Sequence, residues 1–301
     1  MRLKPQTVAR ARAIDPLLAL LLPTLREIRV AQQELSWLKQ EIKDPIKLRR
    51  ACIRRGHLNV PLQYVLGTQP FGKLDIQCRP GVLIPRWETE EWCLNLCRLL
   101  HMHNKQSSLN VVDLCTGTGC IPLTIAKECG VHNNKISGVD ISTQAISLFR
   151  LNIRTHFPTT DTNINPILGD VFQPLEMFQS QTGIQCADLV TANPPYIDPA
   201  QFVDPLHTER SVRRYEPRLA LVGGVEIYRA IFNLSQGLQS KAIILEVGSL
   251  SQIDFVRSLA HPNWHSVAVK DSAGNYRAVA LWNNPDFEFL KKMGSFNPTE
   301  F

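Results

Sequence analysis

Four short apolar segments, each followed at once by a polar or glycine-containing turn, constrain the fold of this chain more than any other feature. They are residues 109–114, 135–139, 164–168 and 187–192, and the turns after them contain Gly117 and Gly119, Asp140, Asp170 and Asn193. Short apolar runs between turn residues are typical of buried strands. Ligands of open α/β sheets bind at the carboxyl ends of the strands, so these turns indicate a site.

The C-terminal third adds more strands to this α/β pattern. Residues 241–247 form a strongly apolar fifth strand that contains Glu246, and residues 264–270 and 277–282 form a terminal strand pair. A long polar loop is expected over Asp198–Arg218, of the kind that often serves as a lid or binding loop. The tail from Asn283 is expected to be loosely ordered.

The first turn is a glycine loop, Asp113-Leu114-Cys115-Thr116-Gly117-Thr118-Gly119. Its two glycines let the backbone turn sharply and approach a ligand closely. A helix opens near Pro122, and its N-terminus offers free N–H groups. The loop lacks the third glycine of a dinucleotide-binding pattern, because position 122 is proline, and it lacks the lysine of a phosphate-binding loop.

Acidic residues end the second and third strands. Asp140 lies about 20 residues past the glycine loop, where one carboxylate commonly accepts hydrogen bonds from both ribose hydroxyls. Asp170 follows Gly169, and its carboxylate could accept from an exocyclic amine. The alternative for each acid alone is a helix cap or a turn former.

The fourth turn is Asn193-Pro194-Pro195-Tyr196. Each proline fixes its own φ and lacks an N–H, so the turn is stiff and its carbonyls have few local donors. Asn193 adds a side-chain acceptor and Tyr196 a flat aromatic face. This combination suits a planar –NH2 group, although an ordinary proline-rich loop with a capping asparagine would read the same way.

The N-terminal region differs in character from the rest. Residues 7–66 carry leucines and isoleucines at helical spacing, and residues 67–84 are divided by glycines and prolines as in a β-hairpin. We therefore predict a helical domain over 1–66, a hairpin linker over 67–84 and a catalytic domain over 85–301. Acids at 88, 90 and 91 suit the first turn of a helix, whereas Arg86 and Trp87 have no such local explanation.

Composition limits the classes of protein. The net charge of +6 suits an acidic partner such as RNA or an acidic protein, and no apolar run reaches the 18 or so residues of a membrane span. Eight cysteines without a Cys-x-x-Cys pair indicate reduced thiols. Cys93, Cys97 and His101 have helical spacing that could suit a metal, but buried thiols on a helix are favoured.

The basic, acid-poor start of the chain has the character of an organelle transit peptide. Arg2, Lys4, Arg10 and Arg12 precede the first acid, Asp15. The alternative is the basic start of a first helix.

With these motifs the chain resembles class I S-adenosylmethionine-dependent methyltransferases, and among them the HemK/PrmC family, which methylates the glutamine N5 atom of class 1 peptide chain release factors. The matching segments are Pro61–Gly67, Val82–Glu91, Asp113–Gly119, Val139–Asp140, Asn193–Ile197, Tyr215–Leu221, Leu245–Gly248 and Lys270–Asp271 with Arg277. The glycine loop is common to the superfamily, and the Asn-Pro-Pro-Tyr turn is shared with DNA adenine and RNA guanine amino-methyltransferases. The segment from Pro85 to Glu91 and the helical domain point to the release factor enzymes.

The resemblance implies a seven-stranded Rossmann-like sheet, mostly parallel with the last strand antiparallel, a small N-terminal helical domain and a linking β-hairpin. It implies that S-adenosylmethionine is bound by Cys115, Thr116, Gly117, Thr118, Gly119, Asp140, Asp170, Val171 and Asn193. It implies that the catalytic residues are Asn193, Pro194 and Tyr196, and that Pro195, Arg86 and Glu88 help to bind the substrate. Two positions depart from the family pattern: Cys115 stands where glycine is frequent, and Val171 where an aromatic residue can stack on adenine, a role that Phe172 could take.

The expected function is N5-methylation of the glutamine in the Gly-Gly-Gln motif of a class 1 release factor, with S-adenosylhomocysteine as product. We expect no metal, no direct DNA contact and no membrane span, and we expect the mitochondrial matrix as location. One alternative is an amino-methyltransferase that acts on an RNA or DNA base. Another is a non-catalytic assembly factor that keeps the fold, which would predict damage to the glycine loop or the Asn193 turn, and both are intact.

Overall fold

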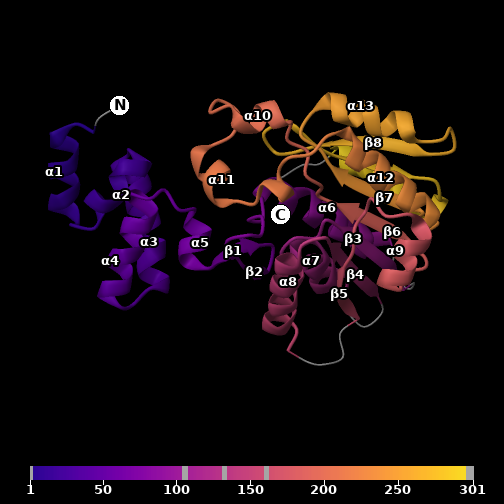
Figure 1. Cartoon of the computed structure of the whole chain (residues 1–301), viewed down its shortest axis with the longest axis horizontal. Coiled ribbons are helices and arrows are strands. Elements are labelled where there is room, and N and C mark those ends of the chain that lie inside the picture. Colours follow the sequence, from indigo (N-terminus) through magenta and orange to yellow (C-terminus); the bar gives the residue numbers. More distant parts are fainter. Residues whose placement is uncertain (1–2, 104–107, 131–133, 159–162, 296–301) are drawn as a thin grey trace. The chain divides into compact units, whose positions relative to one another are not determined.

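The computed structural model describes residues 3–103, 108–130, 134–158 and 163–295 (Figure 1). Internal contacts divide the chain into two compact units. The helical unit comprises Met1–Thr68 and Glu209–Tyr215, and the sheet unit comprises Gln69–Thr208 and Glu216–Phe301. By its contacts the segment 209–215 therefore joins the helical unit, whereas the sequence prediction had placed all of 85–301 in the catalytic domain.

The helical unit is a small bundle. Its helices are α1 (Pro5–Ile14), α2 (Leu18–Leu25), α3 (Ile28–Glu41), α4 (Pro45–Gly56), α5 (Leu62–Leu66) and α11 (Arg210–Tyr215). Helix α4 begins at Pro45, and the Asp44 side chain caps it by accepting from the N–H groups of Ile46 and Lys47. Leucines of α2 and α3 at helical spacing form the core with α4.

Two features hold α4 against its neighbours. At Gly56 a Cβ atom would lie 1.8 Å from the carbonyl oxygen of Leu20, so only glycine allows this approach of α4 to α2. The Arg55 guanidinium donates to both carboxylate oxygens of Glu34 on α3, at 2.7 and 2.8 Å, and Glu34 is 7% exposed. A bidentate pair with so little exposure is stronger than a surface ion pair.

The sheet unit contains the remaining elements. They are β1 (Thr68–Phe71), β2 (Leu74–Gln77), α6 (Trp87–His103), β3 (Asn110–Leu114), α7 (Cys120–Cys129), β4 (Lys135–Asp140), α8 (Thr143–His156), β5 (Ile164–Leu168), α9 (Leu175–Thr182), β6 (Leu189–Ala192), α10 (Pro199–Val203), η1 (Arg218–Ala220), α12 (Val225–Gly237), β7 (Ala242–Glu246), α13 (Leu250–Leu259), β8 (His265–Lys270), β9 (Tyr276–Trp282) and η2 (Pro285–Ser295). Strands β1 and β2 form a separate two-stranded sheet.

The main sheet has seven strands in the order β5-β4-β3-β6-β7-β9-β8. The neighbours from β5 to β7 pair in parallel, and β9 pairs antiparallel with both β7 and β8. The predicted mostly parallel sheet with an antiparallel last strand is confirmed. The chain runs outward from β3 to β5, then returns to β6 beside β3, so the strand order reverses between β3 and β6.

Helices cover both faces of this sheet (Figure 1). Neighbouring strand residues point to opposite faces, so Val111 belongs to one buried cluster and Val112 to the other. The first cluster contains residues of α6, α7 and η2, and the second contains residues of α9, α12 and α13. Strands buried on both faces explain why the sequence shows continuous apolar runs rather than alternation.

Two expectations about irregular segments are wrong. The predicted polar loop Asp198–Arg218 contains α10 and α11, and α10 starts with a cap, since the Asp198 side chain accepts from the N–H of Ala200. The tail predicted to be loose forms η2, in which Phe287, Leu290 and Met293 are buried against the first cluster. Residues 296–301 lie outside the described residues.

Among the residues described, no helix combines the length and the apolar character that a membrane crossing needs.

We predict that Glu34→Gln loosens the helical unit. The variant leaves the Arg55 charge without its carboxylate partner, so the free energy of local opening of α3 and α4 should fall by about 1.5–3 kcal/mol. Hydrogen exchange of the amides in α3 and α4, in the full chain, measures this quantity.

The matched control is Lys39→Ala, which removes the ion pair of Lys39 with Asp15 in the same unit. The Lys39 side chain is 48% exposed, so the loss should stay below about 1 kcal/mol. Equal losses in the two variants would contradict the importance of the Glu34–Arg55 pair.

Candidate functional site

A cavity of about 300 Å³ opens in the sheet unit at the carboxyl ends of β3, β4 and β6. This is the place where the strand order reverses, the usual ligand position in open α/β sheets. The lining is mostly apolar with a few polar groups: Gly81, Val82, Leu83, Ile84, Pro85, Arg86, Thr89, Cys115, Thr116, Gly117, Thr118, Cys120, Ile121, Val139, Asp140, Ile141, Ser142, Ala145, Gly169, Asp170, Val171, Phe172, Asn193, Pro195, Pro217, Leu219, Ala220, Val222, Gly223, Gly224, Glu226 and Ile227. Such a cavity suits a small organic ligand.

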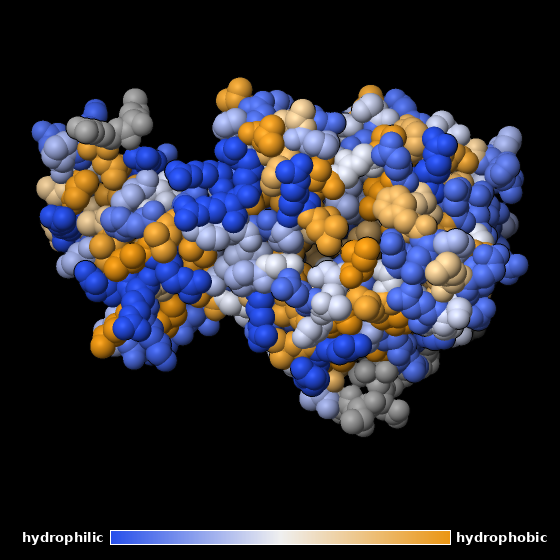
Figure 2. Space-filling view, viewed as in Figure 1, coloured by the Kyte–Doolittle hydropathy of each residue, from blue (hydrophilic) through white to orange (hydrophobic). Residues whose placement is uncertain are grey.

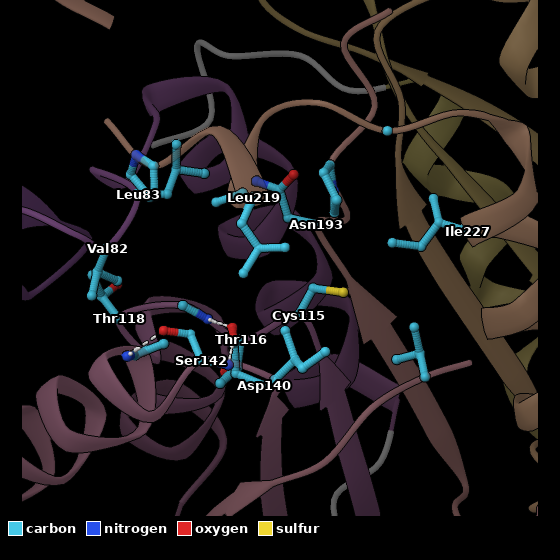
Figure 3. Close-up of a pocket in the computed structure, with 18 of the residues that line it drawn as sticks. Val82, Leu83, Cys115, Thr116, Thr118, Asp140, Ser142, Asn193, Leu219 and Ile227 are labelled. Carbon is cyan, nitrogen blue, oxygen red and sulfur yellow. Dashed lines mark hydrogen bonds between the residues drawn. The ribbon is translucent and has the colours of Figure 1, made fainter. Parts of the chain in front are cut away.

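The surface view agrees with this description. Figure 2 shows apolar side chains gathered around a hollow in the surface of the sheet unit. In the view of Figure 3, Asn193 lies above Cys115, with Asp140 and Thr116 below it.

The glycine loop has an unusual backbone. Cys115, Gly117 and Gly119 all have left-handed φ values, of 59°, 57° and 79°. At Gly119 a Cβ atom would lie 2.0 Å from the Phe149 ring, so glycine is required there. Cys115 is not glycine, and its left-handed conformation costs about 1–2 kcal/mol. The side chain of Cys115 nevertheless fits, since it lines the cavity and packs against the second core cluster.

Asp140 holds the loop in place. Its Oδ2 atom accepts from the N–H of Gly117 and its Oδ1 atom from the N–H of Ser142, both at 2.8 Å. Burial raises the pKa of the Asp140 carboxyl, and these backbone N–H groups partly offset the rise. A carboxylate has about four acceptor positions, so Asp140 can still accept from two neighbouring hydroxyls.

The third strand end gives an apolar wall next to an acid. Asp170 Oδ1 accepts from the N–H of Phe172 at 2.9 Å, which makes a local turn. Val171 is buried, whereas Phe172 is 59% exposed, and all three residues line the cavity. Phe172 is therefore accessible to a ligand as an aromatic surface.

The Asn193 turn presents acceptors. The Asn193 Nδ2 atom donates to Thr89 Oγ1 at 3.1 Å. Within the described part of the chain, no donor reaches Asn193 Oδ1 or the Pro194 carbonyl. Asn193 and Pro195 line the cavity; Pro194 and Tyr196 are not among the lining residues.

The turn is also held from behind. Ile197 forms a parallel bridge with Val222, and at Gly223 a Cβ atom would lie 2.1 Å from the Pro195 carbonyl oxygen. Glycine is therefore required at 223 for the close approach of the two segments. The Tyr196 hydroxyl donates to Glu246 Oε1 at 3.2 Å, and burial raises the pKa of this phenol, which stays neutral.

Arg86 and Glu88 are both engaged in ion pairs. Arg86 donates to Glu216 at 2.7 Å and lines the cavity. Glu88 lies 3.4 Å from Arg277, which also donates to Asp271 at 2.7 Å. Glu88 is not among the lining residues, so of this predicted pair only Arg86 contributes to the cavity surface.

The hydrogen-bond network that supports the Asn193 turn was not predicted from the sequence, and neither were the roles of Thr89, Trp92 and Glu246 in it. Thr89, Trp92 and Tyr196 all donate to the buried carboxyl group of Glu246. The only local signal was a single acid inside an otherwise apolar strand. Apolar lining residues from other segments, such as Val82, Leu83 and Leu219, lie in stretches that match the family pattern, but no binding role was predicted for them.

The cysteine spacing on α6 reflects core packing. Cys93 and Cys97 are buried, as favoured from the sequence, and His101 is exposed. In the ranges that the structure describes, no group of three or more His, Cys, Asp or Glu side chains could hold a metal ion.

Comparisons with known proteins agree with this geometry. The family described as a methyltransferase domain matches residues 105–221. The mitochondrial MRF1 N(5)-glutamine methyltransferase MTQ1 of Saccharomyces cerevisiae is 36% identical, with 92% of this chain and 88% of that protein covered. The probable MRF1 mitochondrial N(5)-glutamine methyltransferase mtq1 of Schizosaccharomyces pombe is 35% identical, with 89% and 92% covered.

More distant relatives extend the same picture. The release factor glutamine methyltransferase of Bacillus anthracis is 30% identical, with 86% of this chain and 85% of that protein covered. Among solved structures, the hMettl16 catalytic domain in complex with the MAT2A 3'UTR hairpin 6 has a TM-score of 0.53 at 17% identity, with 78% of this chain and 83% of that chain covered. At this identity the likeness concerns the fold.

Asp113, at the end of β3, should make the stability of the protein depend on pH. It is fully buried, and this burial raises the pKa of its carboxyl to about 7, although the Thr191 and Thr116 hydroxyls lower it in part. Between the ordinary pKa of 3.8 and about 7, the folded state therefore holds a proton that the unfolded state has lost. The contribution of Asp113 to the free energy of unfolding falls as the pH rises through this window and is constant above it.

The measurement compares the wild type with Asp113→Asn by urea unfolding at about pH 5 and about pH 8. The wild type should lose more stability than the variant on going to the higher pH. A difference between the two proteins that stays the same at both pH values would contradict this account.

Proposed function

Because the chain belongs to the release factor glutamine methyltransferases, a family of S-adenosylmethionine-dependent enzymes, we propose that it methylates the N5 atom of the glutamine in the Gly-Gly-Gln motif of a class 1 release factor. One observation carries the proposal. Asn193 Oδ1 and the Pro194 carbonyl are two neighbouring acceptors that no described donor satisfies, at the strand end beside the cavity. A primary amide offers two N–H groups to such a pair.

The residues around the cavity fit S-adenosylmethionine, which supplies an activated methyl group when bound. In the proposal Cys115 to Gly119 hold its methionine part, and Asp140 accepts from the ribose with the acceptor positions that Gly117 and Ser142 leave open. Asp170 and Val171 hold the adenine side, where the exposed Phe172 ring can add a stacking surface. Asn193 borders both parts of the site.

The chain's own contribution to the reaction is orientation. The nitrogen of an amide is a poor nucleophile, because its lone pair is delocalised into the carbonyl. Asn193 Oδ1 and the Pro194 carbonyl hold the two N–H groups, which fixes the direction of the lone pair and favours the positive charge that develops on the nitrogen. Both protons stay on the amide nitrogen, hydrogen-bonded to these acceptors, until the new N–C bond has formed; one proton then leaves the nitrogen for solvent water.

Tyr196 and the prolines keep this arrangement stiff. Tyr196 is tied by its hydroxyl to Glu246 and by its carbonyl oxygen to Gln252, so its ring has a fixed place next to the turn. In the proposal this ring packs on the amide plane, and Pro195 borders the same space. Arg86 and Glu88 take part in substrate binding at the start of α6.

Recognition of the rest of the release factor is assigned to the helical domain, residues 1–66, with residues 67–84 as linker and 85–301 as catalytic domain, apart from Glu209–Tyr215, which belongs to the helical unit by its contacts. We place the protein in mitochondria, in the matrix. The support is that two relatives of 36% and 35% identity are named as mitochondrial enzymes. The proposal involves a protein substrate and needs no direct contact with DNA.

Asn193→Ala should abolish methyl transfer while leaving cofactor binding within about threefold, because only the substrate amide loses an acceptor on which catalysis depends. The test is mass spectrometry of a recombinant mitochondrial release factor after incubation with the protein and S-adenosylmethionine. The wild type should add one methyl group to the Gly-Gly-Gln glutamine. If no release factor gained a methyl group while cofactor binding stayed intact, the methyl acceptor would instead be a nucleic-acid base.

Asp140→Asn should weaken S-adenosylmethionine binding by about 10- to 100-fold, since hydrogen bonds to a charged group contribute about 1.5–3 kcal/mol each. Isothermal titration calorimetry measures the dissociation constant directly. The control is Asp188→Asn, an acid at the opposite end of the sheet that pairs with Lys241 at 2.7 Å. Unchanged binding in Asp140→Asn, or equal weakening in both variants, would remove Asp140 from the proposed cofactor site.

A further inference from the structure

The carboxyl group of Glu246 is the centre of a buried hydrogen-bond network behind the Asn193 turn. Its Oε2 atom accepts from Thr89 Oγ1 at 2.6 Å and from Trp92 Nε1 at 2.8 Å, and its Oε1 atom accepts from the Tyr196 hydroxyl at 3.2 Å. Glu246 is 1% exposed. A buried carboxylate needs such donors, and here they come from α6 and from the turn.

The network fixes the direction of each hydrogen bond. A threonine hydroxyl has a single proton. Burial raises the pKa of Glu246, and the hydrogen bonds from Thr89, Trp92 and Tyr196 offset part of this rise. Its Oε2 atom already accepts from the Trp92 indole, which can only donate, so this oxygen is an acceptor toward Thr89 as well. Thr89 therefore gives its proton to Glu246, and its oxygen can only accept from Asn193. Asn193 must turn its –NH2 group to Thr89, as the 3.1 Å contact from Nδ2 has it, so its Oδ1 atom is left for the cavity.

Trp92 holds the Oε2 atom of Glu246 beside Thr89. An indole N–H only donates, and Trp92 lies one helical turn after Thr89 on α6, so both side chains meet the same Oε2 atom. The acceptor end of Glu246 is thereby held against α6. Glu246 therefore orients Asn193, although no hydrogen bond joins the two residues directly.

We propose that Glu246 is a positioning residue that acts through Thr89 to fix the amide orientation of Asn193. The inference rests on the proposed function, in which Asn193 Oδ1 accepts from the substrate amide. A rotated Asn193 would point its own N–H groups at the N–H groups of the substrate, and two donors repel each other. The network therefore selects the one orientation of Asn193 that can bind an amide nitrogen.

The central test is Thr89→Val, which keeps the shape of the side chain and removes the hydroxyl. We expect kcat for release factor methylation to fall by about 10- to 100-fold, because the acceptor is no longer held in one orientation. The KM for the release factor and the dissociation constant for S-adenosylmethionine should stay within about threefold. Thr89→Ser restores the hydroxyl and should recover most of the loss.

Two further variants separate positioning from general stability and from charge. Tyr228→Phe removes another buried hydrogen bond of the same residue, from Tyr228 to the Glu246 backbone oxygen at 3.1 Å, and should leave kcat near that of the wild type. In Glu246→Gln the side-chain oxygen can still accept from Thr89 and Trp92, so this variant should lose less than Thr89→Val.

A wild-type kcat in Thr89→Val, a failure of Thr89→Ser to recover activity, or an equal loss in Tyr228→Phe would overturn the proposal. A larger loss in Glu246→Gln than in Thr89→Val would also overturn it, since the charge rather than the orientation would then matter. These outcomes require an active wild type. A wild type without methyl transfer to any release factor would refute the proposed function instead.

Discussion

The site depends on the burial of carboxyl groups at the ends of parallel strands. Burying a carboxylate costs free energy unless donors surround it, and Asp140 has a local donor, the N–H of Ser142, and needs others from further along the chain. Asp140 finds them in the glycine loop, and Glu246 finds them in α6 and the Asn193 turn. Each acid thereby ties segments that are far apart in sequence, and the cavity is the space that these ties leave open.

The two acids act on opposite parts of the site. Asp140 holds the N–H of Gly117, which keeps the loop close to β4, and in the proposed site its remaining acceptor positions serve the cofactor. Glu246 uses its acceptors on protein donors, so its influence reaches the cavity only through Thr89 and Asn193. In the proposed site, one carboxylate therefore binds the cofactor directly, and the other acts by orienting a neutral amide.

The sequence alone predicts those features of the fold that depend on residues close together in the chain. The positions of the strands and the residues Asp140, Asp170 and Asn193 follow from apolar runs and the turn residues after them, whereas the mostly parallel sheet was implied by the family resemblance. The Glu246 network did not follow, because Thr89 and Glu246 are 157 positions apart and an acid inside an apolar strand does not indicate which donors will surround it. The helices within the predicted loop 198–218 were missed for another reason: they are short, and only the Asp198 cap signals the first of them.

The prolines and the bridge to Val222 explain why the Pro194 carbonyl remains available. A carbonyl in an ordinary turn accepts from an N–H a few residues further on, but the N–H of Ile197, three residues after Pro194, donates to the Leu221 carbonyl instead, and Pro195 has no N–H. An acceptor without a partner costs free energy when it is buried, and the cost is smaller here because the turn lies at the edge of a cavity that water or a ligand can enter. The same stiffness that keeps the Pro194 carbonyl unsatisfied also prevents the backbone from relaxing around it. The side chain of Asn193 lacks that constraint and could rotate, which is why its orientation has to come from Thr89 and Glu246.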